Sequence, residues 1–419
     1  MKHLKTFVII GFPFLLAAAL IVWIKRDPPT SNPANILITP EQTTISSAPA
    51  ITTTAQSVIP IDTKSAPPEK LVSHPVAMDA GNPTPAHEVS PGHDPAYAAL
   101  YEKVTLLLRQ QKEGDAIRVL NEIIQMVPSD LQAHTLLGDL YYKRDQVDKA
   151  IFVWEKMLKN DPANERIQFL LEKARRERDT QTKFVHESTR HFTIKFEGAE
   201  SRSLYKTVLD ILEEAYGEVG RALLFYPTEE IIVFLYTDQQ FFDVTRAPAW
   251  TGGIFDGKIR IPTKGSETRL PVLRRILFHE YVHAMLHQMR KGGTSRVGEF
   301  PIPTWLNEGV AQYFEPESRE RTRELNARLQ PWIKLDGIVP LSQLHGSFLG
   351  VNDPRIAALI YDESLSAVSF LVGRFGIWRL KMLLEDLPTK QNLDEAMQSA
   401  LLVSYENFQS NWEDALQGR

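Results

Sequence analysis

The sequence predicts an α+β protein in which all-α helical hairpins precede a domain that combines a small sheet with further helices. Residues 95–182 show a helical pattern that repeats every 34 positions. Residues 183–419 alternate short strand-like runs with longer stretches of helical spacing. The chain before residue 95 has neither period, so we expect the folded part to begin there.

The overall composition limits the classes of protein. The chain has 419 residues, with 47 Lys+Arg against 52 Asp+Glu and a net charge of -5, and it has no cysteine. This length allows two or three domains, and the near-neutral charge argues against a nucleic-acid-binding protein, which usually carries a clustered basic surface. The absence of cysteine excludes a disulfide scaffold, an iron–sulfur protein and a cysteine nucleophile. Any metal must therefore be bound by His and carboxylate side chains.

The N-terminal residues 1–26 have the pattern of a signal anchor. The uncharged stretch Phe7–Ile24 comprises 18 residues and is flanked on both sides by basic residues, and this length just suffices to cross a bilayer. A cleavable signal peptide is the alternative, but cleavage at Ala17–Ala19 would leave an apolar tail on the mature protein. We therefore expect an uncleaved, single-pass anchor in the cell membrane, with the soluble domains periplasmic or extracellular.

Residues 27–94 are expected to form a disordered linker. They are rich in Pro, Ser and Thr, as in Pro28-Pro29 and Thr52-Thr53-Thr54. Such a composition buries too little apolar surface to offset the entropy of ordering the chain. The linker would tether the folded domains to the membrane.

Residues 95–182 are expected to hold two helical repeats and a polar capping helix at about 164–179. Positions 34 residues apart carry Ala116 and Ala150, Leu120 and Trp154, and Pro128 and Pro162. The second unit resembles the tetratricopeptide (TPR) signature through Leu137, Gly138, Tyr141, Ala150, Trp154 and Pro162. An ordinary bundle of helical hairpins is the alternative. Two repeats form only a small concave surface, so packing on the neighbouring domain and capture of a protein partner are both open as roles.

The first part of 183–419 is expected to alternate strands and helices. The predicted elements are strands at His191–Phe196 and Ile231–Tyr236 and a helix at Ser203–Leu224. Within Trp250–Pro262, apolar Ile259 and Ile261 alternate with Lys258 and Arg260, which favours an edge strand. Such an edge can pair with an extended peptide, although a hairpin with glycine turns explains the same residues.

The strongest signal for chemistry is the sequence His279-Glu280-Tyr281-Val282-His283. On a helix, the two histidines lie one turn apart on the same face and can bind one metal ion. Glu280 follows the first histidine, where its carboxylate can reach a metal-bound water instead of the metal. This is the H-E-x-x-H pattern of zinc peptidases.

A catalytic zinc needs a third protein ligand, and Glu308 is the candidate. Together, the two motifs resemble the gluzincin clan of zinc metallopeptidases, in particular the peptidase MA-like domains that often follow TPR repeats. The resemblance covers about 183–419. It implies that His279, His283 and Glu308 are zinc ligands and that Glu280 is the general base and proton shuttle.

The sequence disfavours three other assignments of the site. Glu299 competes as third ligand, but it lies at a loop entry, whereas Glu308 is expected on a helix. A metzincin would need glycine and histidine where this chain has Leu286 and Met289, so that class is excluded. Basic residues flank the motif too closely for an intramembrane protease.

Two further side chains follow the ligands at helical spacing. His287 lies one turn beyond His283, but a fourth protein ligand would close the site, so a surface or supporting role is the better interpretation. Glu315 lies seven residues after Glu308 and can accept a hydrogen bond from a ligand imidazole. Pro316 disfavours helical geometry at Glu315, so this contact stays open.

Gluzincins commonly carry a tyrosine or histidine that donates a hydrogen bond to the oxyanion. Tyr361 is the candidate here, because it follows a predicted loop through Asn352-Asp353-Pro354 and lies near the start of a helix predicted at Asp362–Arg374. The alternative is that Tyr361 only packs this helix against the core. His345 is the next candidate donor.

We therefore expect a membrane-anchored, zinc-dependent metallopeptidase that hydrolyses peptide bonds by Glu-assisted attack of zinc-bound water. The expected cofactor is Zn2+, the substrate is a peptide or protein, and the TPR module can bind a protein partner. The alternative is a TPR scaffold for cell-envelope assembly, whose zinc domain is structural or catalytically silent. Glu280 distinguishes the two, because a structural site has no need of a carboxylate beside its first ligand.

Overall fold

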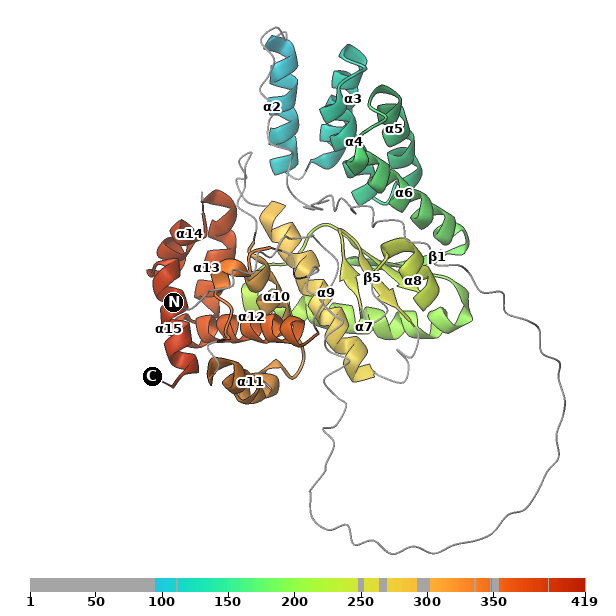
Figure 1. Ribbon diagram of the computed structural model, residues 1–419. Helices are drawn as coiled ribbons and strands as arrows, with labels where there is room; N and C mark the ends of the chain where they lie inside the picture. The colour runs from blue at the N-terminus through green and yellow to red at the C-terminus, as the bar shows by residue number, and fades with distance from the viewer. Residues whose placement is uncertain are drawn as a thin grey trace, which may run out of the picture. The chain divides into compact units, whose positions relative to one another are not determined.

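The computed structural model describes residues 95–110, 112–247, 252–263, 270–291, 302–334, 337–346, 348, 354–390 and 392–418. The predicted anchor at 1–26 and the predicted linker at 27–94 lie outside these residues. The described chain contains TPR-like helical hairpins followed by a five-stranded sheet with further helices (Figure 1). This arrangement confirms the predicted α+β class.

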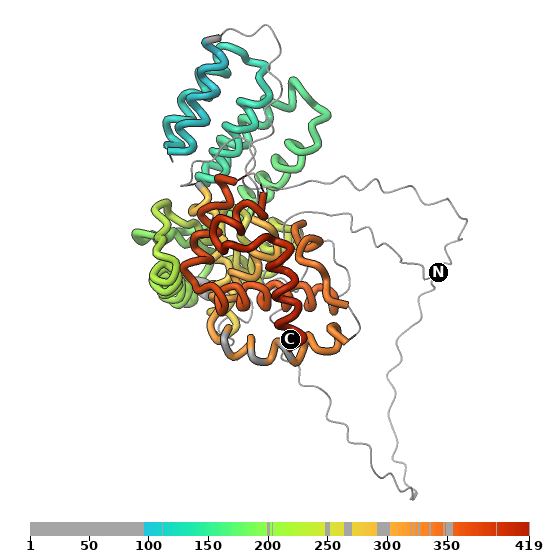
Figure 2. Tube along the Cα trace, turned by 90° about the vertical axis from the view of Figure 1, so that its left-hand side faces the viewer, coloured from blue at the N-terminus to red at the C-terminus, as the bar shows by residue number. Residues whose placement is uncertain are grey.

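The N-terminal helices follow one another as hairpins (Figure 2). They are α2 (Pro95–Arg109), α3 (Glu113–Met126), α4 (Leu131–Lys143), α5 (Val147–Asn160) and α6 (Glu165–Thr180). The Asp130 side chain caps α4, and the Asn164 side chain caps α6. Gly138 allows α4 and α5 to approach closely, because a Cβ atom there would lie 2.1 Å from Trp154 Nε1.

The sheet has the strand order β1-β2-β3-β5-β4. Its strands are β1 (Val185–Ser188), β2 (Phe192–Phe196), β3 (Ile231–Tyr236), β4 (Ile254–Phe255) and β5 (Ile259–Pro262). β2, β3 and β5 are parallel, whereas β1 and β4 run antiparallel to their neighbours. Helix α7 (Gly198–Leu223) connects β2 to β3, and α8 (Asp238–Thr245) follows β3. The strands predicted near 191–196 and 231–236 are therefore present, and the helix predicted between them starts earlier than expected.

The prediction of an edge strand at 259–262 is wrong, and the alternative, a hairpin with a glycine turn, is present as β4 and β5 with Gly257 between them. β5 pairs with β3 on one side and with β4 on the other, so in the described chain β4 lies at this end of the sheet. Lys258 is 1% exposed and Arg260 is 0% exposed. The alternation of charged and apolar residues arises because both faces of the sheet are buried here. Helix α6, and not water, covers the face that carries Lys258 and Arg260.

The other face of the sheet packs on α7 and on α9 (Leu270–Lys291). This face contributes Phe192, Ile194, Phe196, Ile231, Val233, Leu235, Ile259 and Ile261 to the main core. The core continues into α10 (Thr304–Tyr313), α11 (Ser318–Lys334), α12 (Pro354–Phe375), α13 (Ile377–Asp386), α14 (Leu393–Leu401) and α15 (Tyr405–Leu416). Figure 1 shows α9 between the sheet and these C-terminal helices. Helix α9 is therefore covered by protein on opposite sides.

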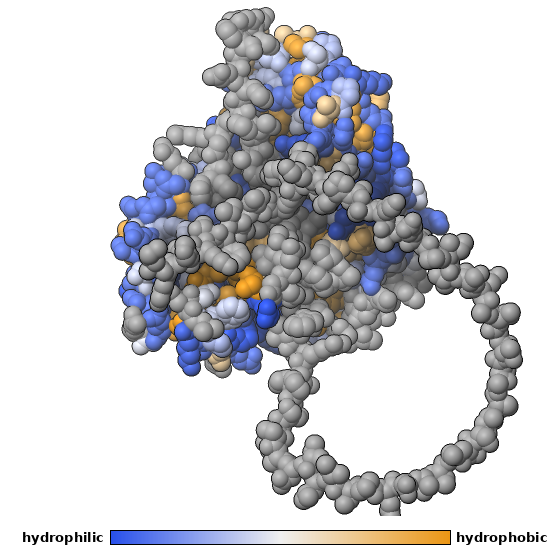
Figure 3. All heavy atoms as spheres, in the orientation of Figure 1, coloured by the Kyte–Doolittle hydropathy of each residue, from blue (hydrophilic) through white to orange (hydrophobic). Residues whose placement is uncertain are grey.

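Among the described residues, one helix is long and apolar enough to cross a bilayer, and it is Arg355–Phe375 within α12. Its apolar window is 67% buried inside the protein, so its apolar side chains serve the core. The described atoms on the face drawn in Figure 3 are mostly hydrophilic, and apolar residues form small groups among them. The predicted membrane location depends on residues 1–26 and stays a prediction.

Glu363 of α12 is a buried carboxyl group in this core. It is 0% exposed, its Oε1 accepts a hydrogen bond of 3.0 Å from the Val339 N–H, and its Oε2 has no hydrogen-bond partner among the described residues. Burial raises the pKa of Glu363 to about 8 from its ordinary value of 4.5. The folded protein therefore favours the protonated form.

We expect Glu363→Gln to change the pH dependence of stability. Because the folded pKa is raised, the contribution of Glu363 is fully present below pH 4.5 and is lost as the pH rises through about 8. Relative to wild type, the variant should gain on the order of 3 kcal/mol in unfolding free energy between pH 4.5 and pH 8.5. Urea unfolding at both pH values measures this gain, and an equal difference at both would contradict the assignment.

Candidate active site

Helix α9 brings the two histidines of the H-E-x-x-H sequence together. The helix is apolar on most faces, with Leu277, Phe278 and Val282 fully or almost fully buried, as expected of a helix that crosses a core. His279 is 0% exposed and His283 is 7% exposed. Their ring centroids lie 4.7 Å apart. Both imidazoles therefore share one face of the helix inside the protein.

Helix α10 adds a carboxylate to this pair. Glu308 Oε2 lies 3.3 Å from His279 Nε2 and 3.6 Å from His283 Nε2. One ligand atom from each of these three residues lies within 4.8 Å of the others, and they form a group that can hold a metal ion. The start of α10 is fixed by the Trp305 N–H, which donates a hydrogen bond of 3.0 Å to the Leu344 carbonyl oxygen.

The donor atoms of this cluster match a divalent cation. Six buried atoms of the three ligands and the neighbouring Glu280 have no hydrogen-bond partner among the described residues: His279 Nε2, His283 Nδ1 and Nε2, Glu280 Oε1 and Oε2, and Glu308 Oε2. Buried polar atoms are normally paired, so a converging group of unpaired acceptors calls for a ligand. Two imidazoles and one carboxylate form a donor set typical of catalytic zinc, which keeps one position open.

The electrostatics of the cluster favour positive charge at its centre. Burial alone would lower the pKa of His279, but Glu308 and Glu315 raise it to about 10. Burial alone would raise the pKa of Glu308, but His283 and His279 lower it to about 2. Burial raises the pKa of Glu280 to about 7, although the two histidines oppose this effect. Glu280 therefore has the proton affinity of a group that can exchange a proton near neutral pH.

Glu315 contacts His279 at the ring nitrogen that faces away from Glu308. Its Oε1 lies 2.7 Å from His279 Nδ1, and its Oε2 lies 2.7 Å from Arg321 Nη1. As Pro316 predicts, Glu315 is not helical, because α10 ends at Tyr313 and Glu315 lies in the bend before Pro316. The contact forms nevertheless, and it fixes the orientation of the imidazole. Arg321 could not be predicted, since its approach to Glu315 depends on the chain reversal at Glu317, where φ is 61°.

Tyr361 lies beside the cluster and not at a helix start. It is inside α12, which begins at Pro354, so the predicted helix boundary at Asp362 is wrong. Its backbone oxygen accepts a hydrogen bond of 3.0 Å from Gln312 Nε2. Burial raises its pKa well above the usual value, and the charges of Glu308 and Glu280 raise it further. The hydroxyl therefore lies within electrostatic reach of both carboxylates.

Three other candidates lie apart from the cluster or outside the described chain. His345 Nε2 lies 3.0 Å from the Tyr405 hydroxyl, so this nitrogen is engaged there. The His287 ring packs beside Phe255, with ring centroids 5.6 Å apart, and His287 is not a member of the metal-binding group. Glu299 lies outside the described residues.

Close packing of α10 on α12 positions Glu308 and Tyr361 near each other. A Cβ atom at Gly309 would lie 2.3 Å from the Ser364 carbonyl oxygen and 2.6 Å from Val368 Cγ2. Only glycine allows this approach of the two helices. A glycine inside an expected helix is a sequence sign of such contact, and sequence reasoning missed it here.

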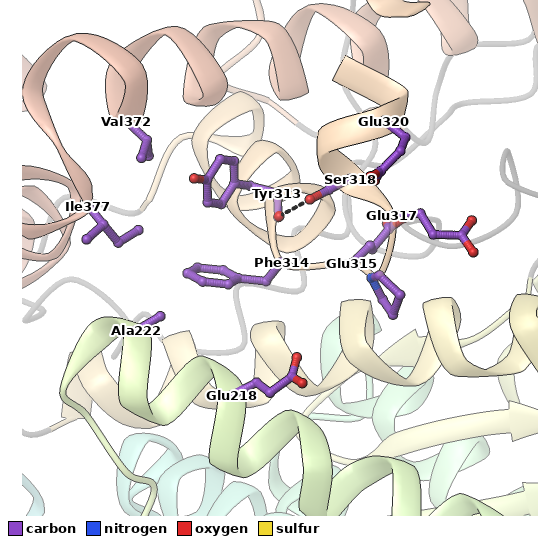
Figure 4. A pocket seen from close by; sticks show the side chains of 11 residues that line it. Glu218, Ala222, Tyr313, Phe314, Glu315, Glu317, Ser318, Glu320, Val372 and Ile377 are labelled. Carbon is purple, nitrogen blue, oxygen red and sulfur yellow. Dashed lines mark hydrogen bonds between the residues drawn. The ribbon is translucent and has the colours of Figure 1, made fainter. Parts of the chain in front are cut away.

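A separate pocket of about 560 Å³ lies at the α10–α11 turn (Figure 4). Phe314, Val372 and Ile377 line it, together with Glu218 of α7. None of the three clustered ligands lines this pocket, although Glu315, which contacts His279, does. The buried cluster, not the pocket, is therefore the candidate active site.

The described chain combines helical repeats with a sheet-and-helix domain whose buried cluster can hold a metal ion. Residues 225–418 match the family model of the Peptidase MA superfamily, and residues 107–174 match a tetratricopeptide repeat model. No curated protein matches the chain significantly. The chain thus carries TPR repeats followed by a Peptidase MA superfamily domain, which confirms the predicted order.

We expect Gly309→Ala to destabilise the protein by about 1–3 kcal/mol, because the added methyl group must displace α12. Gly217→Ala in α7 is the matched control, since a Cβ atom there meets nothing within 4 Å. The control should gain up to about 1 kcal/mol from helix propensity. Urea unfolding measures both, and equal stability of the two variants would contradict the close contact.

Proposed function

We propose that the chain is a membrane-anchored, zinc-dependent metallopeptidase of the gluzincin type that acts on peptides or proteins. The observation that carries the proposal is the convergence of His279, His283 and Glu308, with Glu280 beside them, in a Peptidase MA superfamily domain. Zinc, when bound by these three ligands, supplies a Lewis acid and lowers the pKa of a coordinated water.

Glu280 is the group that moves the proton. Its two carboxylate oxygens are buried and have no hydrogen-bond partner among the described residues, so they are available to the attacking water. In this proposal one oxygen of Glu280 takes the proton of that water and then delivers it to the leaving amine nitrogen. A structural metal site would gain nothing from burying such an unpaired carboxylate, which weighs against the scaffold alternative.

Tyr361 is the proposed donor to the substrate. As the peptide carbonyl is attacked, negative charge develops on its oxygen, and a neutral hydroxyl close to the metal ligands can stabilise that charge. Tyr361 suits this role because its raised pKa keeps the hydroxyl protonated beside Glu308 and Glu280. A partner of the TPR module and the membrane anchor remain parts of the proposal that rest on the sequence.

Substitution of Glu280 and Glu308 should separate catalysis from metal binding. Glu280→Gln should keep about one zinc per chain and abolish hydrolysis, whereas Glu308→Ala should lose the metal. Metal analysis and mass spectrometry of products from a peptide library measure the two effects. Glu406→Ala, at an exposed position of α15, is the control and should change neither. Full zinc retention in Glu308→Ala would assign the third ligand elsewhere, with Glu299 next to test.

Tyr361→Phe removes only the hydroxyl group. We expect kcat to fall by about 10²–10³-fold, with KM and zinc content unchanged. Tyr281→Phe is the matched control, because the buried Tyr281 packs beside Phe192, with ring centroids 6.1 Å apart. A normal kcat in Tyr361→Phe would leave this tyrosine a packing role only.

A further inference from the structure

Helix α6 of the TPR region contacts the β4–β5 hairpin of the peptidase domain through two charged residues one turn apart. Lys173 Nζ lies 2.6 Å from Asp256 Oδ2, at the tip of the hairpin. Glu177 Oε1 lies 2.5 Å from Lys258 Nζ, and Glu177 Oε2 lies 2.8 Å from Arg260 Nη2. All five side chains are at most 10% exposed. The hairpin is therefore bound to α6 by buried ion pairs.

The hairpin residues are also linked to one another and to a second TPR segment. Arg260 Nε lies 3.0 Å from both carboxylate oxygens of Asp256. Lys258 Nζ lies 2.7 Å from Asp145 Oδ1 in the α4–α5 turn. Buried charges are strongly held only when each has its partner. The network thus fixes the hairpin on the TPR helices as a unit.

The same hairpin touches the candidate active site on its other side. A Cβ atom at Gly253 would lie 3.1 Å from Glu280 Cγ and 2.9 Å from Ile276 Cγ2. The backbone at Gly253, just before β4, therefore packs against the side chain of Glu280. Because the Glu280 oxygens have no hydrogen-bond partner among the described residues, packing has to set the direction of this carboxylate.

We propose that Lys173 and Glu177 are positioning residues of the peptidase, because they hold the β4–β5 hairpin and thereby hold the backbone of Gly253 against Glu280. The TPR region is then part of the catalytic structure and not only a docking module. This inference rests on the proposed function for its catalytic consequence, while the mechanical link between α6 and the hairpin does not depend on it.

Lys173→Met in the full chain is the main test, because it keeps the aliphatic stem and leaves Asp256 paired with Arg260. We expect kcat to fall by about 10- to 100-fold, the loss that small displacements of a reacting group produce. KM should stay within about twofold of wild type and zinc content should be unchanged, since no ligand is touched. Amide hydrogen exchange at 254–262 should become roughly tenfold faster as the hairpin loosens.

Three further single variants and one double variant make the test specific. Arg175→Met on the same helix removes an exposed ion pair with Glu155 within the TPR region, and it should change neither kcat nor exchange. Lys173→Arg keeps the positive charge, so its kcat and its hydrogen exchange at 254–262 should both be those of wild type. Asp256→Asn and its combination with Lys173→Met complete a double-mutant cycle, in which the double variant should lose no more kcat than the more affected single variant.

Each outcome decides one part of the inference. Faster exchange with an unchanged kcat would overturn the positioning role, and unchanged exchange in Lys173→Met would overturn the link between α6 and the hairpin. If zinc-loaded wild type hydrolyses no peptide, the proposed function fails. The exchange data would then still support or overturn the mechanical link.

Discussion

The requirement that buried charge be paired governs both the candidate site and the junction of its two folded regions. Helix α9 crosses an apolar core, so every charge next to it is costly unless a partner lies close. His279 meets carboxylates at both ring nitrogens, from Glu308 and Glu315. On the opposite face of the sheet, Glu177 meets Lys258 and Arg260 in the same way. Glu280 alone in this set keeps two unpaired oxygens, and they are the atoms with which we expect the substrate chemistry to begin.

Helices and strands that depend on short-range residue patterns could be predicted from the sequence. The TPR helices follow from a 34-residue period, and β3 follows from a β-branched run. The placement of β5 could not be predicted, because its pairing with β3 and its cover by α6 join residues far apart in the chain. The alternation of Lys258 and Arg260 with apolar residues therefore favoured an edge strand, although an inner strand with one charged and one apolar buried face has the same alternation.

Within the candidate site, too, short-range spacing could be predicted from the sequence, whereas contacts between distant residues could not. The spacing of His279 and His283 already defines a shared helix face, and the structure brings Glu308 to it. The contact of Glu315 with His279 was left open by the sequence, because Pro316 disfavours helical geometry there, and Glu315 reaches His279 from the bend after α10. Arg321 had no sequence signal, because its contact depends on a left-handed turn at Glu317. The glycines at 252 and 253 permit close backbone approach, but the partners of Gly253 depend on a hairpin that packs against α9. Supporting contacts of this kind arise only once the chain is folded.

The polar character of α6 takes on a different meaning in the folded protein. A terminal helix of a repeat array usually needs a polar outer face to remain soluble, and the sequence of α6 fits that description. Two of its charged residues, Lys173 and Glu177, are instead buried against a hairpin that carries the complementary charges. The charged residues of α6 and those on the charged face of the sheet thus form ion pairs with each other, so both sets can be buried away from water. Packing on the neighbouring domain, one of the two roles open to a short repeat array, is therefore a role that α6 fulfils.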